Sequence, residues 1–140
     1  DVCSSDLPFQ PPERFVPTAV ALNCGVYRAP VSEDEKDQSN LLMADLLPER
    51  GTKDEYEKIS LVNYVTSQYP PVFLMTATGD FLREQATLLV EKLMEFEIPF
   101  VYRYYGSVER PLGHVFHCNI RLQEASRCND EECEFFRSYC

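Results

Sequence analysis

The clearest pattern of apolar and polar positions lies between residues 70 and 117. A short apolar run at 72–75 ends in small residues. Apolar residues then recur at alternating spacings of four and three, which indicates a helix with one apolar face: Leu82, Ala86, Leu89, Leu93 and Phe96. Pro99 ends that helix, and the aromatic and β-branched run 100–105 predicts a strand. The stretch therefore predicts a βαβ unit with parallel strands and a right-handed crossover.

A carboxylate and an imidazole follow the two strands of this unit. Asp80 comes after the first strand, and His114 comes after the second. Open α/β sheets bind ligands outside the carboxyl ends of their strands, so both side chains are expected at that edge. A carboxylate there can fix the tautomer of an imidazole and stabilise the imidazolium form. Asp80 and His114 are thus the candidate catalytic residues.

The chain before this unit predicts a further strand and a long connection. The apolar stretch 18–27 is typical of a strand covered on both faces. The connection 28–69 is too long for a simple crossover and includes two helix candidates, 39–47 and 54–65, after an acidic run at 32–37. The first candidate has more apolar surface than an exposed helix needs. Residues 28–69 are therefore interpreted either as helices that cover the sheet or as a cap or lid over the site.

The C-terminal tail predicts one or two helices. Asn129 and Glu132 resemble a capping box, which predicts a helix start at that point. Cys133, Phe136 and Tyr139 follow at helical spacing. This stripe is expected to pack the last helix on the sheet.

Composition and charge narrow the class of protein. The 140 residues suffice for one domain, with 44% hydrophobic and 26% charged residues as in soluble globular proteins. A formal charge of −10 argues against nucleic acid or an anionic membrane as partner. The sequence has no apolar run long enough to span a membrane. Six irregularly spaced cysteines are interpreted as reduced thiols, which weakly favours the cytoplasm, and Cys24 as a small buried hydrophobe. Residues 1–8 are interpreted as a non-native or disordered segment.

The order of these segments resembles a known enzyme family. The segment PPVFLMTATGD, followed 34 residues (114 − 80) after its aspartate by HVFH, is similar to the acid and histidine segments of the α/β-hydrolases. The nearest branch is the esterase/lipase group related to hormone-sensitive lipase, with D-x-L and H-x-F turns. The acid turn of this chain, Asp80-Phe81-Leu82-Arg83, matches only loosely. The resemblance implies hydrolysis of carboxylic esters through an acyl-enzyme, with Asp80 orienting His114 and no cofactor.

The nucleophile that this family needs is missing. A G-x-S-x-G turn requires two glycines four residues apart, and no two of the five glycines have that spacing. Neither histidine precedes a glycine, so an H-G-G oxyanion loop is absent as well. Residues 9–140 are therefore expected to be the C-terminal half of an α/β-hydrolase fold: about three parallel strands, flanking helices and a cap insertion at 28–69. Alone, this half is expected to be inactive and to require the missing N-terminal half before it acts on a small-molecule ester.

Three alternatives remain open. His117 is the nearest rival of His114 as the base. A zinc-binding module could instead use the side chains His114, His117, Cys118, Cys128 and Cys133. A non-catalytic interaction domain could retain the fold without the chemistry.

Overall fold

A three-stranded parallel sheet forms the centre of the molecule. The computed structural model describes residues 15–29 and 38–139; the segments 1–8 and 32–37 lie outside the described residues. The strand order is β1-β2-β3, with the bounds Val20–Asn23, Val72–Ala77 and Phe100–Tyr105. β2 pairs in parallel with both neighbours. The predicted parallel sheet of about three strands is confirmed.

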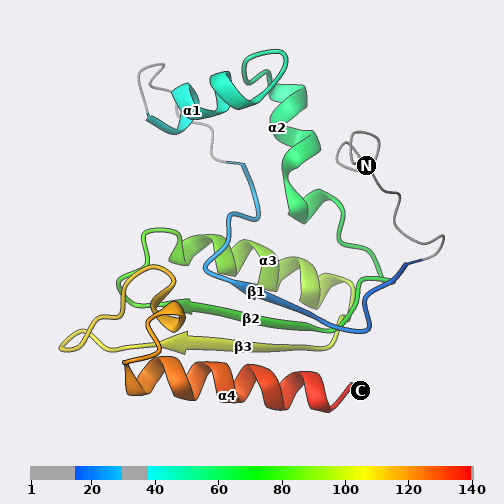
Figure 1. Cartoon of the computed structure of the whole chain (residues 1–140). Coiled ribbons are helices and arrows are strands. Elements are labelled where there is room, and N and C mark those ends of the chain that lie inside the picture. The colour runs from blue at the N-terminus through cyan, green and yellow to red at the C-terminus, as the bar shows by residue number, and fades with distance from the viewer. Residues whose placement is uncertain (1–14, 30–37, 140) are drawn as a thin grey trace.

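Two helices cover the two faces of this sheet. Helix α3 (Arg83–Glu95) lies on one face and helix α4 (Gln123–Arg137) on the other (Figure 1). Every residue of β2 is buried, as expected for a strand covered on both sides. Its side chains alternate, because Phe73 and Met75 pack in the cluster with α4, whereas Val72 and Leu74 pack in the cluster with α3. The result is an α/β/α sandwich whose carboxyl edge presents the loops after the strands.

The long connection between β1 and β2 forms a separate lobe. Helix α1 spans Gln38–Leu46, helix α2 spans Lys53–Ile59, and the short 3₁₀ helix η1 spans Leu61–Asn63. The lobe of α1 and α2 lies beyond α3, away from the sheet (Figure 1). Thr52 and Glu55 form a capping box at the start of α2 that sequence analysis did not identify.

The first strand and the second helix of the long connection are shorter than expected. The stretch 18–27 forms a strand only up to Asn23, because Cys24 has a left-handed backbone with φ 51° that ends the extended conformation. The helix expected at 54–65 ends at Ile59. Ser60 has an extended backbone, and its hydroxyl donates to the carbonyl of Tyr56 at 2.7 Å.

The last helix starts earlier than the capping pattern predicts. Helix α4 begins at Gln123, so Asn129 lies inside it, and the Asn129 side-chain amide donates to the carbonyl of His117 at 3.2 Å. Phe136 and Tyr139 pack against the sheet cluster as expected. Cys133 is exposed, and the residue that anchors this end of the helix is the buried Phe135.

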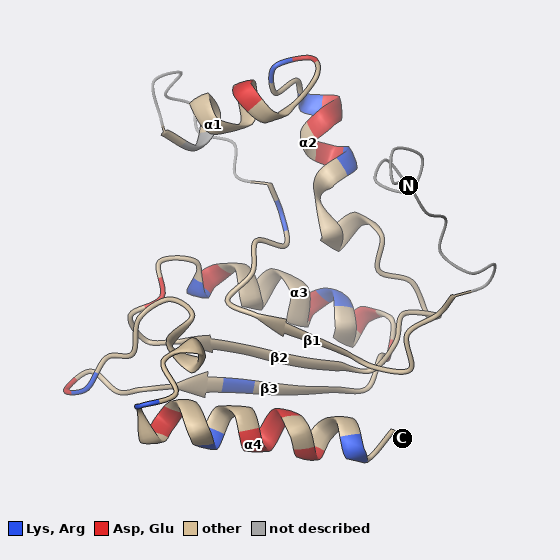
Figure 2. Cartoon of the chain, viewed as in Figure 1, with Lys and Arg blue, Asp and Glu red and all other residues tan. Residues whose placement is uncertain are grey.

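Charged residues of both signs are distributed along α2, α3 and α4 (Figure 2). Glu131 of α4 accepts from Arg103 of β3 at 2.6 Å and from Arg127 of α4 at 2.8 Å. Hydrogen bonds from Arg103, Arg127 and Tyr105 lower the pKa of the Glu131 carboxyl, although burial acts first and in the opposite direction. This network joins the last helix to the edge strand. No helix in the described part of the chain is long and apolar enough to cross a membrane.

Candidate active site

Asp80 lies in the turn directly after β2 and is fully buried. Its Oδ1 accepts from the backbone N–H of Leu82 at 2.9 Å, and its Oδ2 accepts from the hydroxyl of Thr76 at 2.8 Å. Burial favours the neutral acid. The hydrogen bonds from Leu82, Thr76, His114 and Cys24 outweigh that effect and hold the pKa of Asp80 below its usual value. The site therefore holds a buried carboxylate that is ionised at neutral pH.

The loop that carries His114 is attached to the loop that carries Asp80. Gly79 and Gly113 form a parallel bridge beyond the ends of β2 and β3, and the Gly79 N–H donates to the carbonyl of Leu112 at 2.9 Å. This close approach requires glycine at position 79, because a Cβ there would lie 2.9 Å from the same carbonyl oxygen. The sheet ladder thus extends past the strands and fixes the two loops against each other.

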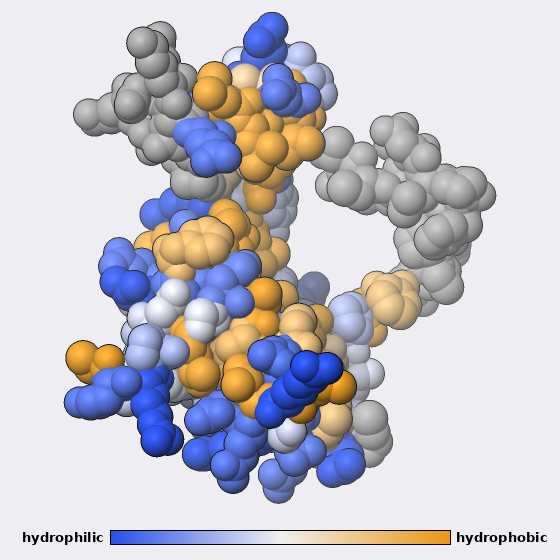
Figure 3. All heavy atoms as spheres, turned by 60° about the vertical axis from the view of Figure 1, so that its left-hand side comes forward, coloured by the Kyte–Doolittle hydropathy of each residue, from blue (hydrophilic) through white to orange (hydrophobic). Residues whose placement is uncertain are grey.

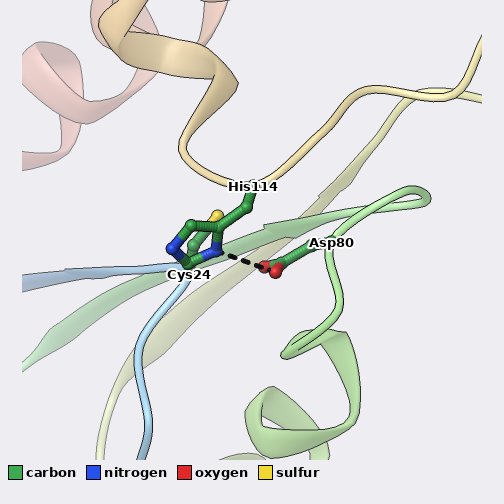
Figure 4. Close-up of side chains that lie close together, drawn as sticks. All are labelled: Cys24, Asp80 and His114. Atoms are coloured by element: carbon green, nitrogen blue, oxygen red, sulfur yellow. Dashed lines mark hydrogen bonds and ion pairs between the residues drawn. The ribbon is translucent and has the colours of Figure 1, made fainter.

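The two candidate residues meet at this edge (Figure 4). The Nδ1 of His114 lies 2.9 Å from the Oδ1 of Asp80. An ionised carboxylate only accepts hydrogen bonds, so the shared proton belongs to Nδ1 and the neutral ring keeps Nε2 as an acceptor. The His114 side chain is 33% exposed. This is the arrangement of a general base that is oriented by an acid and remains open to a reacting group.

An aromatic side chain flanks the imidazole. Phe81, the residue after the acid, has its ring centroid 4.7 Å from that of His114, at an interplanar angle of 43°. Phe81 is nevertheless 75% exposed. Its ring therefore contacts the imidazole with one side and presents apolar surface beside the site with the other.

Cys24 is a third side chain of the site. It follows the end of β1, and its thiol, the Asp80 carboxylate and the His114 ring offer atoms that lie within 4.8 Å of one another (Figure 4). Burial raises the pKa of the Cys24 thiol to about 12, although a backbone hydrogen bond from Val115 acts in the opposite direction. The sequence predicts that Cys24 is buried but does not place it in the site. The strand-end rule that identified Asp80 and His114 misses it, because the predicted strand 18–27 continues past Cys24, whereas β1 ends at Asn23.

His117 takes no part in this pair. It lies on the 3₁₀ helix η2 (Phe116–Cys118), and its Nδ1 is buried without a hydrogen-bond partner. Burial lowers the pKa of His117, the charge of Glu132 raises it, and His114 lowers it further. The zinc module considered from the His and Cys spacing is not formed. Among the described residues, Cys24, Asp80 and His114 are the one group of three potential ligands whose atoms lie close enough to hold a metal ion. The Sγ of Cys118 lies only beside Nε2 of His117, at 3.7 Å.

An apolar groove opens next to the acid turn. It has a volume of about 410 Å³ and is bounded by the residues after β1, by the lobe and by the acid turn: Val26, Ala29, Leu42, Met43, Ile59, Phe81 and Leu82. Hydrophobic side chains gather on the lobe of α1 and α2 at the top of Figure 3. The groove has the size of small-molecule sites in proteins. Phe81 belongs both to this groove and to the surroundings of His114.

Comparison with solved structures identifies the fold. The chain is similar to the crystal structure of esterase B from Lactobacillus rhamnosis, with a TM-score of 0.71 and 20% identity over 87% of this chain. It is also similar to the same esterase inhibited by a C6-C4 SN3 compound, with a TM-score of 0.72 and 21% identity. The form inhibited by a C4-C4 SN3 tributyrin phosphonate gives a TM-score of 0.67 and 21% identity.

These matches cover only part of each esterase chain. They cover 40%, 41% and 40% of the esterase chains, so this chain spans well under half of the structures it matches. No protein-family model and no curated protein matches the sequence. The three-stranded parallel sheet with its flanking helices is a partial α/β-hydrolase fold.

Proposed function

We propose that this chain is the C-terminal part of a serine hydrolase that cleaves carboxylic esters, and that it supplies the acid Asp80 and the base His114. The observation that carries the proposal is the 2.9 Å hydrogen bond between these residues, beyond the carboxyl ends of two neighbouring strands. The partial α/β-hydrolase fold, which matches part of an esterase structure, supports the same reaction class. The His114-Val115-Phe116 turn favours the branch related to hormone-sensitive lipase, which the acid turn at Asp80 matches only loosely.

In this mechanism His114 transfers protons and Asp80 stabilises the positive charge that forms on it. Nε2 of His114 accepts the proton of a serine hydroxyl while that oxygen attacks the ester carbonyl. The imidazolium then gives the proton to the leaving alcohol, and a second cycle with water releases the acid from the acyl-enzyme. Asp80 keeps the ring oriented and stabilises its positive charge without becoming protonated. The low pKa of Asp80 suits that role.

The nucleophile is proposed to come from a segment outside these residues. The 140-residue sequence contains no G-x-S-x-G. Cys24 is a poor substitute, because burial raises its thiol pKa to about 12 and the thiol contacts Asp80 rather than an open substrate path. The chain alone is therefore expected to show no reaction with a fluorophosphonate probe and no ester hydrolysis above background.

We assign the acyl chain of the ester to the apolar groove beside Phe81. The groove joins the surroundings of His114 to the lobe, so a substrate carbonyl near the imidazole can place its hydrocarbon tail there. Residues 28–69 then act as a cap that shapes the pocket and limits access of water. The tributyrin phosphonate that inhibits esterase B supports a short acyl group.

A non-catalytic interaction domain is the second candidate. A binding protein with this fold could retain the buried Asp80 and its hydrogen bonds for stability alone. The discriminating feature is the nucleophile position, which in that case lacks serine.

The test is ester turnover by the full protein whose sequence includes these 140 residues, with p-nitrophenyl butyrate as substrate. His114→Ala is expected to lower kcat at least about 1,000-fold, since it removes the base of a triad. His117→Ala serves as the matched control and is expected to retain kcat within a few-fold. Turnover that survives in His114→Ala, or that is lost only in His117→Ala, contradicts the proposal.

A further inference from the structure

We infer that Cys24, Asp80 and His114 form a binding site for Zn²⁺ that competes with the acid–base function of the pair. The three side chains come from the loops after three neighbouring strands, and their ligand atoms lie within 4.8 Å of one another. Thiolate, imidazole and carboxylate are the three ligand types that zinc uses in proteins. The sulfur and nitrogen donors favour zinc over calcium or magnesium, which prefer oxygen.

The surroundings of the cluster suit a bound ion. One thiolate and one carboxylate neutralise the two positive charges of zinc, which limits the cost of a buried ion. The Asp80 carboxylate is already oriented by the Leu82 N–H and the Thr76 hydroxyl, and outer hydrogen bonds of this kind hold metal ligands in place. Cys24 is held at the strand end by its left-handed backbone, φ 51°. The partly exposed His114 gives an ion access from solvent.

Binding changes the protons of the site in a defined way. The Cys24 thiol releases its proton to water and forms a sulfur–zinc bond. The Nδ1 of His114, which faces Asp80 at 2.9 Å, gives up its proton to bind the ion, and the neutral ring carries its proton on Nε2 instead. That tautomer cannot accept a proton from a hydroxyl group. Zinc is therefore expected to block the base function of His114, independently of which substrate the full protein uses.

The experiment measures Co²⁺ and Zn²⁺ binding to the metal-free 140-residue chain. Co²⁺ is expected to give a thiolate-to-cobalt charge-transfer band that saturates at one ion per chain and is removed by Zn²⁺. Cys24→Ser is expected to lose this band, and His114→Gln to weaken binding at least ten-fold. The matched controls Cys118→Ser and Cys133→Ser replace exposed thiols outside the cluster and are expected to bind as the parent does.

The second substitution keeps the test valid if Cys24→Ser unfolds the buried strand end. His114 is partly exposed, so His114→Gln is expected to keep the far-ultraviolet circular dichroism of the parent chain. Absence of saturable binding by the parent overturns the inference. A charge-transfer band of full intensity in Cys24→Ser, or unchanged affinity in a folded His114→Gln, overturns it as well. None of these readouts depends on ester hydrolysis. A negative result here would therefore refute the zinc site without refuting the proposed function, and loss of the proposed function would not refute the zinc site.

Discussion

Nδ1 of His114 lies 2.9 Å from Oδ1 of Asp80, although 34 residues separate the two positions in sequence. The parallel pairing of β2 with β3 accounts for this proximity, because it brings the carboxyl ends of both strands to one edge. Beyond that edge the bridge between Gly79 and Gly113 continues the ladder. The geometry of the pair thus depends on the backbone contact between the loops as well as on the two side chains.

The loop contact predicts that two glycine substitutions lower the free energy of unfolding by different amounts. Gly79→Ala places a Cβ 2.9 Å from the carbonyl oxygen of Leu112, whereas a Cβ at Gly113 meets nothing within 4 Å. Gly79→Ala is expected to lower the free energy of unfolding by about 1–3 kcal/mol, because the backbone must shift. Gly113→Ala is the control and is expected to change it by less than about 0.5 kcal/mol. Chemical denaturation measures both, and equal stabilities would contradict the role of Gly79.

Thr76 is predicted to stabilise the ionised form of Asp80. Thr76→Val removes the donor to Oδ2 and is expected to cost about 1.5–3 kcal/mol at neutral pH, since it leaves a buried carboxylate with one hydrogen bond fewer. The folded pKa of Asp80 lies below the unfolded value, so this stability is present above about pH 4 and is lost as the pH falls further. Denaturation as a function of pH is the measurement.

A matched control is available for this effect. Thr87→Val changes an exposed threonine on α3 and is expected to leave the free energy of unfolding within about 0.5 kcal/mol of the parent. The difference between the parent and Thr76→Val is expected to shrink towards acid pH. A constant difference across the whole pH range would show that Thr76 acts through packing and not through the carboxylate charge.

His117 is predicted to make the fold sensitive to mild acid. Burial lowers its pKa in the folded state, so the unfolded chain takes up the proton first. The corresponding stability is present above the unfolded pKa of about 6.5 and is lost as the pH falls through the folded pKa. His117→Gln is expected to flatten the loss of stability in this range, measured by thermal unfolding at several pH values. Parallel curves for the two proteins would exclude this contribution.

Phe81 is predicted to affect substrate choice more than stability. In the full protein, Phe81→Ala is expected to lower kcat/KM for a butyrate ester by about 10- to 200-fold, since it removes a wall of the apolar groove. Its 75% exposure implies a change in unfolding free energy of less than about 0.5 kcal/mol. Val108→Ala, at a position that is 92% exposed, is the control. If Phe81→Ala kept the parent's preference across esters of increasing acyl length, the groove would not be part of the substrate site.

The sheet could be predicted from the sequence because its elements have strong periodic signals. The apolar stripe from Leu82 to Phe96 and the strand at 100–105 lie where the pattern places them. The boundaries of α4 could not be predicted. Asn129 and Glu132 match a capping box, but tertiary contacts extend the helix back to Gln123, and the Asn129 side chain bonds to His117 instead.

The site could be predicted only in part. Asp80 and His114 follow predicted parallel strands, so their proximity could be inferred from topology. Cys24 and the groove could not be inferred, because they depend on where β1 ends and on how α1 and α2 lie over the acid turn. These features result from backbone turns and long-range packing, which have no signal in local composition.

The most direct measurement is the tautomer of His114, read by ¹H–¹⁵N NMR of the ¹⁵N-labelled 140-residue chain at a pH where the imidazole is neutral. We expect a proton on Nδ1, hydrogen-bonded to the carboxylate, and loss of that signal in Asp80→Asn. A neutral His114 ring that carries its proton on Nε2 in the parent chain would contradict the assignment of the pair as acid and base.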